Sequence, residues 1–361
     1  MQIYFGWLTV LYSVIISQGI FAAAILWFAQ RNKLSSRILS VLLLSIALWL
    51  IDTFLGVSGL YKQAPDLYFK PIYYSFAFGP LLYFYVKSLT NASFSFEKKH
   101  LLHFLPVLLQ ALLYWFLTFQ DYTFKRWYWL EVHQPFTYRI EFDGTFVSLA
   151  IYLVFSLQLL RNYQKWLSDN FSEFSRITLN WLKLLLIIML LLCVQWFVEV
   201  ILREFFQNYY DYNFSVLILG ILALLLAFGG IRQISLADVV FANKKEYLAG
   251  KSIVVDKAIL QKILNQMESN KDFLNPTLTL KEFAETLKLP TRMVSEHINN
   301  GLNKSFVDFV NEYRVNEVKH KLQSGELKTY TILAIAFDSG FNSKATFNRI
   351  FKKTTGQSPR E

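Results

Sequence analysis

The segment ILAIAFDSGFNSKATFNRIFKKTTGQSP, residues 332–359, contains the clearest fold pattern in this 361-residue chain. Its first part places apolar side chains on one helix face, and Thr331 precedes them as a candidate helix cap. Gly340 is suited to a tight turn, and Ser343 is suited to capping a second helix. Three side chains of that helix are expected to pack inward: Phe347, Ile350 and Phe351. The pattern predicts a helix, a turn and a helix over 331–355.

A similar pattern occurs earlier in the chain, over residues 279–300. Thr279 and Glu282 have the spacing of a capping box, which predicts a helix start. A second short helix is expected to end at Gly301. A longer helix over 305–323 is expected to join the two units. Its ~17 residues would span ~25 Å.

Residues 332–359, together with NEYRVNEVKHKL at 311–322, resemble the AraC/XylS family of transcription regulators. The similarity covers roughly 265–361. It includes a Gly-Phe turn, a Ser-capped helix with two phenylalanines, and a Lys-x-x-Gly-x-Ser-Pro end. The resemblance implies two helix-turn-helix units that place recognition helices in successive major grooves of double-stranded DNA. Because operators are often palindromic or repeated, it also implies a homodimer.

The resemblance also implies which side chains contact DNA. Base contacts fall on Arg292, Ser295 and Glu296 of the first recognition helix, and on Lys344, Ala345, Asn348 and Arg349 of the second. Phosphate contacts fall on Asn299, Asn300, Lys352 and Lys353. Arginine suits guanine, asparagine suits adenine, and a carboxylate can accept from cytosine. The alternative for each residue is a solvated helix face.

The rest of the chain has a different composition. Overall, 54% of residues are apolar and only 17% are charged, whereas a soluble domain carries roughly 25% charged residues. Residues 1–243 hold 17 of the 36 Lys and Arg residues, spread between long apolar stretches. This composition argues against a soluble enzyme. It predicts a transmembrane domain over 1–232, a connector over 233–256 and a DNA-binding domain over 257–361.

Seven stretches are apolar and long enough to cross a membrane, for which a helix needs ~20 residues. They lie near 3–30, 38–60, 71–89, 100–119, 142–160, 179–202 and 213–231. Lys and Arg are more numerous in the loops that are inside if the N-terminus is outside. The expected orientation is therefore N-outside and C-inside. The predicted fold is all-α: a seven-helix transmembrane bundle followed by an all-helical double helix-turn-helix domain.

Four polar residues fall inside predicted spans: Asp52, Gln195, Glu199 and Arg203. Ionisable groups at membrane depth are costly and often functional. One interpretation is a pocket for a signal molecule, open to the outside. The other is structural pairing, since Glu199 and Arg203 have i,i+4 spacing. The single cysteine, Cys193, is expected to pack in a span.

The sequence as a whole predicts a membrane-anchored, one-component transcription regulator of the bacterial cytoplasmic membrane. Its expected partners are DNA, the lipid bilayer and an unidentified small-molecule or envelope signal. No cofactor, metal site or enzymatic reaction is expected, because no phosphate-binding, metalloprotease or nucleophile motif is present. One alternative is a transporter or channel with a regulatory DNA-binding tail. Another is a membrane enzyme that uses an acid/base pair or a metal cluster of the longest outer loop, with these candidate residues: Asp121, Glu131, His133, Glu141 and Asp143.

Overall fold

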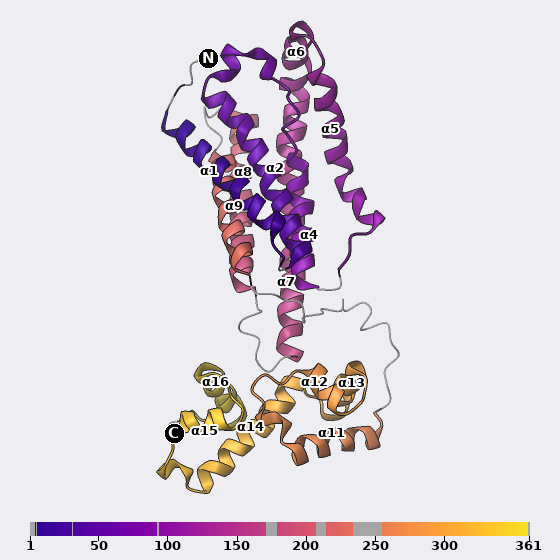
Figure 1. Cartoon of the computed structure of the whole chain (residues 1–361), viewed down its shortest axis with the longest axis vertical. Helices are drawn as coiled ribbons and strands as arrows, with labels where there is room; N and C mark the ends of the chain where they lie inside the picture. The colour runs from indigo at the N-terminus through magenta and orange to yellow at the C-terminus, as the bar shows by residue number, and fades with distance from the viewer. Residues whose placement is uncertain are drawn as a thin grey trace. The chain divides into compact units, whose positions relative to one another are not determined.

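The structure is a computed structural model that describes residue 4 and residues 6–30, 32–91, 94–170, 179–206, 214–233 and 255–359. The regular elements of these residues are helices, which agrees with the all-α prediction (Figure 1). The chain forms two compact units, one of residues 1–161 and 179–241, the other of 162–178 and 242–361. Residues 234–254, most of the predicted connector, lie outside the described part.

The first unit contains the apolar helices. Its main elements are α1 (Trp7–Phe28), α2 (Lys33–Val57), α3 (Leu60–Gln63), α4 (Phe78–Thr90), η3 (Lys98–Phe104), α5 (Leu105–Thr118), α6 (Tyr122–Tyr128), η4 (Trp129–Thr137), residues 138–161 of α7 (Tyr138–Asn170), α8 (Asn180–Phe206) and α9 (Phe214–Arg232). Two short 3-10 turns, η1 (Pro65–Leu67) and η2 (Ser75–Ala77), precede α4.

Six helical segments of the described residues are long and apolar enough to cross a membrane, not seven. The predicted third span, 71–89, is the one that differs. Its helix α4 has 13 residues and would extend only ~20 Å, whereas the hydrocarbon core is ~30 Å thick. Pro65 and Pro71 interrupt the chain before it, and residues 64–77 form turns and irregular backbone. Irregular backbone at membrane depth requires burial in protein or a polar cavity.

The irregular segment and α4 nevertheless run alongside α5 in the opposite direction. Near the end of α5, the Thr118 hydroxyl donates to the Phe69 carbonyl at 3.0 Å. Near the start of η3, the His100 and His103 rings meet the edge of Phe84 at 5.1 and 5.3 Å. The segment thus returns the chain to the end of the unit at which η3 begins.

The two ends of the first unit can be identified from close contacts. The Tyr4 amide donates to the Ser58 carbonyl, so the start of α1 lies beside the end of α2. Gly230, near the end of α9, approaches Leu39 and Leu26 so closely that a Cβ would meet the Leu39 side chain at 2.4 Å. The start of α1 and the end of α9 therefore lie at opposite ends of the unit.

The second unit contains the predicted helix-turn-helix elements. They are α11 (Lys257–Asn270), η6 (Asp272–Leu274), α12 (Leu280–Thr286), α13 (Thr291–Leu302), α14 (Phe306–Gln323), η7 (Glu326–Lys328), α15 (Ile332–Asp338) and α16 (Lys344–Thr355). The capping box of Thr279 and Glu282 forms in both directions, at 2.9 and 3.1 Å. Ser305, Thr331 and Ser343 cap the later helices, as their positions predict. The first recognition helix ends later than expected, at the left-handed Asn303 rather than at Gly301.

The two helix-turn-helix segments of this unit meet at a joint. It is formed by α14, by η6 and by the turn between α15 and α16. The buried Arg314 donates to the carbonyl oxygens of Phe273 and Asn275, both at 2.7 Å. Gly340 has a φ of +91° and packs against the same place, because a Cβ there would lie 2.3 Å from the Phe273 oxygen. The joint holds the turn between α15 and α16 against the segment that leads into α12.

Candidate functional site

Helix α16 separates an inward apolar face from an outward polar face. Phe347, Ile350 and Phe351 are buried against the core that α14 and α15 share. The opposite face exposes the residues predicted to contact DNA: Lys344, Ala345, Asn348, Arg349, Lys352 and Lys353. Ser343 caps the helix through the Thr346 amide, which fixes where the exposed face begins.

Most of the positively charged side chains of α16 have no ion-pair partner among the described residues. Lys353 pairs with Asp308 at 2.7 Å, and both side chains are well exposed. Lys344, Arg349 and Lys352 show no hydrogen bond or ion pair there. An exposed ion pair of this kind contributes at most ~1 kcal/mol, so DNA can replace it. The face is therefore suited to phosphate and base contacts.

Helix α13 presents a more restricted surface. Arg292 and Glu296 form an ion pair at 2.8 Å, and Glu296 is the more buried partner. The second carboxylate oxygen of Glu296 is buried and has no hydrogen-bond partner in the described part of the chain. Asn299 and Asn300 are exposed. A base edge that donates to Glu296 would satisfy the buried oxygen without breaking the pair with Arg292.

Ser295 does not fit its predicted role. It is buried, with 6% of its surface exposed, beside Val294 and Ile298 in the core of α11, α12 and α14. Its hydroxyl accepts from the Asn299 amide at 3.3 Å. The expectation of a base contact is thus corrected, because the helix turns this position inward.

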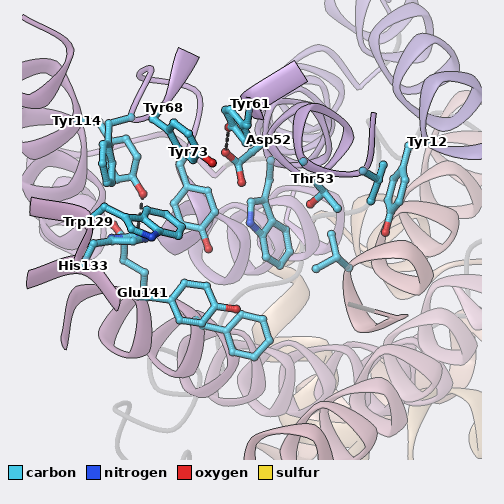
Figure 2. Close-up of a pocket in the computed structure, with 17 residues that line it drawn as sticks. Tyr12, Asp52, Thr53, Tyr61, Tyr68, Tyr73, Tyr114, Trp129, His133 and Glu141 are labelled. Atoms are coloured by element: carbon cyan, nitrogen blue, oxygen red, sulfur yellow. Dashed lines mark hydrogen bonds between the residues drawn. The ribbon is translucent and has the colours of Figure 1, made fainter. Parts of the chain in front are cut away.

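The first unit contains a cavity of about 660 Å³. Its described lining residues are Tyr12, Trp49, Asp52, Thr53, Gly56, Val57, Tyr61, Tyr68, Phe69, Tyr73, Tyr114, Trp129, His133, Tyr138, Glu141, Phe142 and Val216 (Figure 2). Helix α2 supplies one wall, the irregular segment before α4 a second, and η4 with the start of α7 a third. Residues 64–77 form turns and irregular backbone instead of a helical third span. This segment places Tyr68, Phe69 and Tyr73 at the cavity.

Asp52 lines this cavity. The Tyr61 hydroxyl donates a hydrogen bond to its carboxylate (Figure 2). Burial, together with the Asp52 carboxyl, raises the pKa of Tyr61 far above its ordinary value. Tyr61 consequently remains a donor throughout the physiological pH range.

Glu141 is the second carboxyl group of the cavity, and the sequence did not single it out for this role. It accepts hydrogen bonds from Tyr114 at 2.9 Å and from Gln110 at 3.3 Å. Sequence reasoning placed Glu141 and His133 in a loop, whereas both lie in continuous helix, η4 and α7. No local signal distinguished Glu141, because the charged residues Arg139 and Asp143 stand two positions before and after it.

Gln195 and Glu199 do not line the cavity. They pair with each other, and the Ser215 hydroxyl of α9 lies 3.0 Å from Gln195 and 2.6 Å from Glu199. This polar cluster joins α8 to α9, which favours the structural interpretation over a pocket shared with Asp52. The side chain of Arg203 lies outside the described part, so its predicted pairing with Glu199 is not described. No group of three metal-ligating side chains occurs within the described ranges.

Comparison with known proteins gives one match. The family model described as "Helix-turn-helix domain", of the AraC type, matches residues 283–361, from α12 through α16. This match supports an AraC-family, DNA-binding transcription regulator. No curated protein and no solved structure matches the chain significantly. The six apolar helices are compatible with a membrane protein.

Proposed function

We propose that this chain is a membrane-anchored, one-component transcription regulator whose apolar unit senses a signal and whose C-terminal unit binds specific DNA. The main support is the presence, in one chain, of six apolar helices and an exposed, cationic face on α16. The anchor is the bacterial cytoplasmic membrane, with the start of α1 outside and the DNA-binding unit inside. The opposite placement of the start of α1 and the end of α9 supports this orientation.

The proposed control is a shift between two arrangements of the membrane helices. A signal can change this balance only if it binds the two arrangements with different affinity. In a homodimer, such a shift would change the spacing of two DNA-binding units. Binding of the signal at the cavity and of DNA at α16 would then be thermodynamically linked.

The DNA-binding role is tested with full-length protein in lipid nanodiscs. Fragments of the source genome are captured and sequenced at two salt concentrations. Arg349→Ala should weaken binding to the retained sites by roughly 5- to 150-fold, because a good arginine–base contact contributes ~1–3 kcal/mol. Lys319→Ala is the matched control, since it removes an exposed cation of α14 outside both recognition helices. Equal binding by the two variants would refute the role of Arg349.

Orientation is tested by cysteine labelling in intact cells. Cys193 is the single cysteine and is buried, so a Cys193→Ser background carries no thiol. In that background, Asp66→Cys should react with a membrane-impermeant thiol reagent, and Lys352→Cys should react only after lysis. Reaction of both sites in intact cells would contradict a cytoplasmic DNA-binding unit.

A further inference from the structure

The cavity of the first unit has an unbalanced set of charged groups. Two carboxyl groups, Asp52 and Glu141, line it together with the His133 imidazole, and no Lys or Arg is among its described lining residues. The hydrogen-bond partners of both carboxyls are neutral: Tyr61 for Asp52, and Tyr114 with Gln110 for Glu141. Buried carboxylates at membrane depth are stabilised by a cationic partner, which the described walls of this cavity do not supply.

Aromatic rings form most of the remaining wall. The Tyr73 ring packs against two other lining rings. Its centroid lies 5.9 Å from that of Trp49 in a T-shaped arrangement and 5.7 Å from that of Tyr114 in a stacked one. Tyr61 and Tyr68 stack at 4.4 Å beside Asp52. The faces of such rings carry negative potential and attract organic cations, and aromatic cages bind quaternary ammonium groups in this way.

The two features are connected through the same residues. Tyr114 stacks on Tyr73 and also donates to Glu141, and Trp49 lies one helical turn from Asp52 on α2. The carboxyl groups and the aromatic rings therefore border one space (Figure 2). Its volume of about 660 Å³ falls within the range of small-molecule sites, ~300–1,000 Å³. An anion would meet two carboxyl groups there without a compensating cation.

We propose that this cavity binds an organic cation, an amine or quaternary ammonium compound, with Asp52 and Glu141 as charge partners and the tyrosine and tryptophan rings around it. The inference rests on the proposed sensing function and names the chemical class of its signal. It differs from the pocket that was one of two interpretations of the sequence, in which Asp52 was grouped with Gln195, Glu199 and Arg203.

The test is calorimetric binding to the full chain in nanodiscs with three probes: choline, benzyltrimethylammonium and 3,3-dimethylbutan-1-ol. The last is the uncharged carbon analogue of choline, so this pair differs in charge and little in shape. At constant ionic strength set with NaCl, at least one cation should bind roughly tenfold or more tightly than the neutral analogue. If neither cation binds more tightly than the neutral analogue, the proposal is overturned. This comparison uses the unmodified chain and is independent of how any variant folds.

Two isosteric variants then locate the site. Asp52→Asn and Glu141→Gln each remove a charge and keep the side-chain size, and each should weaken binding of the tighter cation by roughly tenfold or more. Asp66→Asn is the matched control, because Asp66 is exposed on η1 and does not line the cavity. Equal cation affinity in all three variants would overturn the assignment to this cavity.

The same preparation separates this inference from the proposed function. Specific DNA capture without selective cation binding would refute the ligand class and leave the DNA-binding role standing. Cation binding without specific DNA capture would support the cavity and refute the regulator.

Discussion

Replacing Gly340 with alanine tests the joint that connects the two helix-turn-helix units. The change has two costs. The backbone φ of +91° disfavours any side chain, at about 1–2 kcal/mol. In addition, the new Cβ would lie 2.3 Å from the Phe273 oxygen and 3.0 Å from Arg314 Nε, within the hydrogen bond between them. Relieving this overlap costs about 1–3 kcal/mol. Gly340→Ala should therefore destabilise the unit by about 2–5 kcal/mol.

Gly325→Ala provides a matched control for the backbone cost. Gly325 has a similar φ of +86°, but no atom lies within 4 Å of a Cβ built there. Replacing Gly325 with alanine should therefore cost only the backbone strain of the positive φ, about 1–2 kcal/mol. The measurement is urea unfolding of the fragment 252–361, monitored by the circular dichroism signal of its helices. The fragment is suitable because this unit has its own buried cores. The difference between the two variants isolates the contact with Phe273.

The joint also predicts an effect on DNA binding. Displacement of the turn between α15 and α16 would shift α16 relative to α13, so a site contacted by both helices should lose more affinity than a half-site contacted by one. A titration of both DNAs, under conditions in which the variant is folded, measures this difference. If Gly340→Ala costs no more stability than Gly325→Ala, or if both DNAs lose affinity equally, the joint does not set the spacing.

Three further predictions concern the second unit. Thr279→Ala should cost about 1 kcal/mol of unfolding free energy because it removes the helix cap, and unchanged stability would contradict that role. Arg314→Met leaves the buried Phe273 carbonyl and the part-buried Asn275 carbonyl without their charged donor, so a loss of about 3–6 kcal/mol is expected by urea unfolding. A loss below about 1 kcal/mol would show that water replaces the guanidinium. Lys353→Ala should change stability by less than about 1 kcal/mol, since its pair with Asp308 is exposed. The same variant should reduce the salt dependence of DNA affinity by about one unit of slope, and an unchanged slope would exclude a phosphate contact.

The helix starts of the second unit were predictable because their signals are local. Thr279, Ser305, Thr331 and Ser343 each cap the helix that follows, through amides three residues ahead. Ser295 was not predictable in this way. Its position on the helical wheel lies at the border between the two faces, and the packing of α11 and α14 against α13 decides on which side it falls.

The predicted third span shows a similar limit. Residues 71–89 have the length and composition of a span, yet the structure contains only the short α4 there. Hydropathy records how apolar a segment is, but not whether lipid or protein surrounds it. Because α4 is almost wholly buried by its neighbours, an incomplete helix preceded by irregular backbone is tolerated at this place.

The sequence by itself determined the class of each half of the chain: apolar stretches of spanning length, and capped helices with the pattern of an AraC-type helix-turn-helix. These properties depend on composition, periodicity and neighbours within one helical turn. The tertiary structure alone decided which polar groups share a space. It placed Asp52 with Glu141, 89 positions apart in the sequence, and placed Glu199 with Ser215 instead. Side-chain grouping across helices depends on how the helices pack, which no local pattern records.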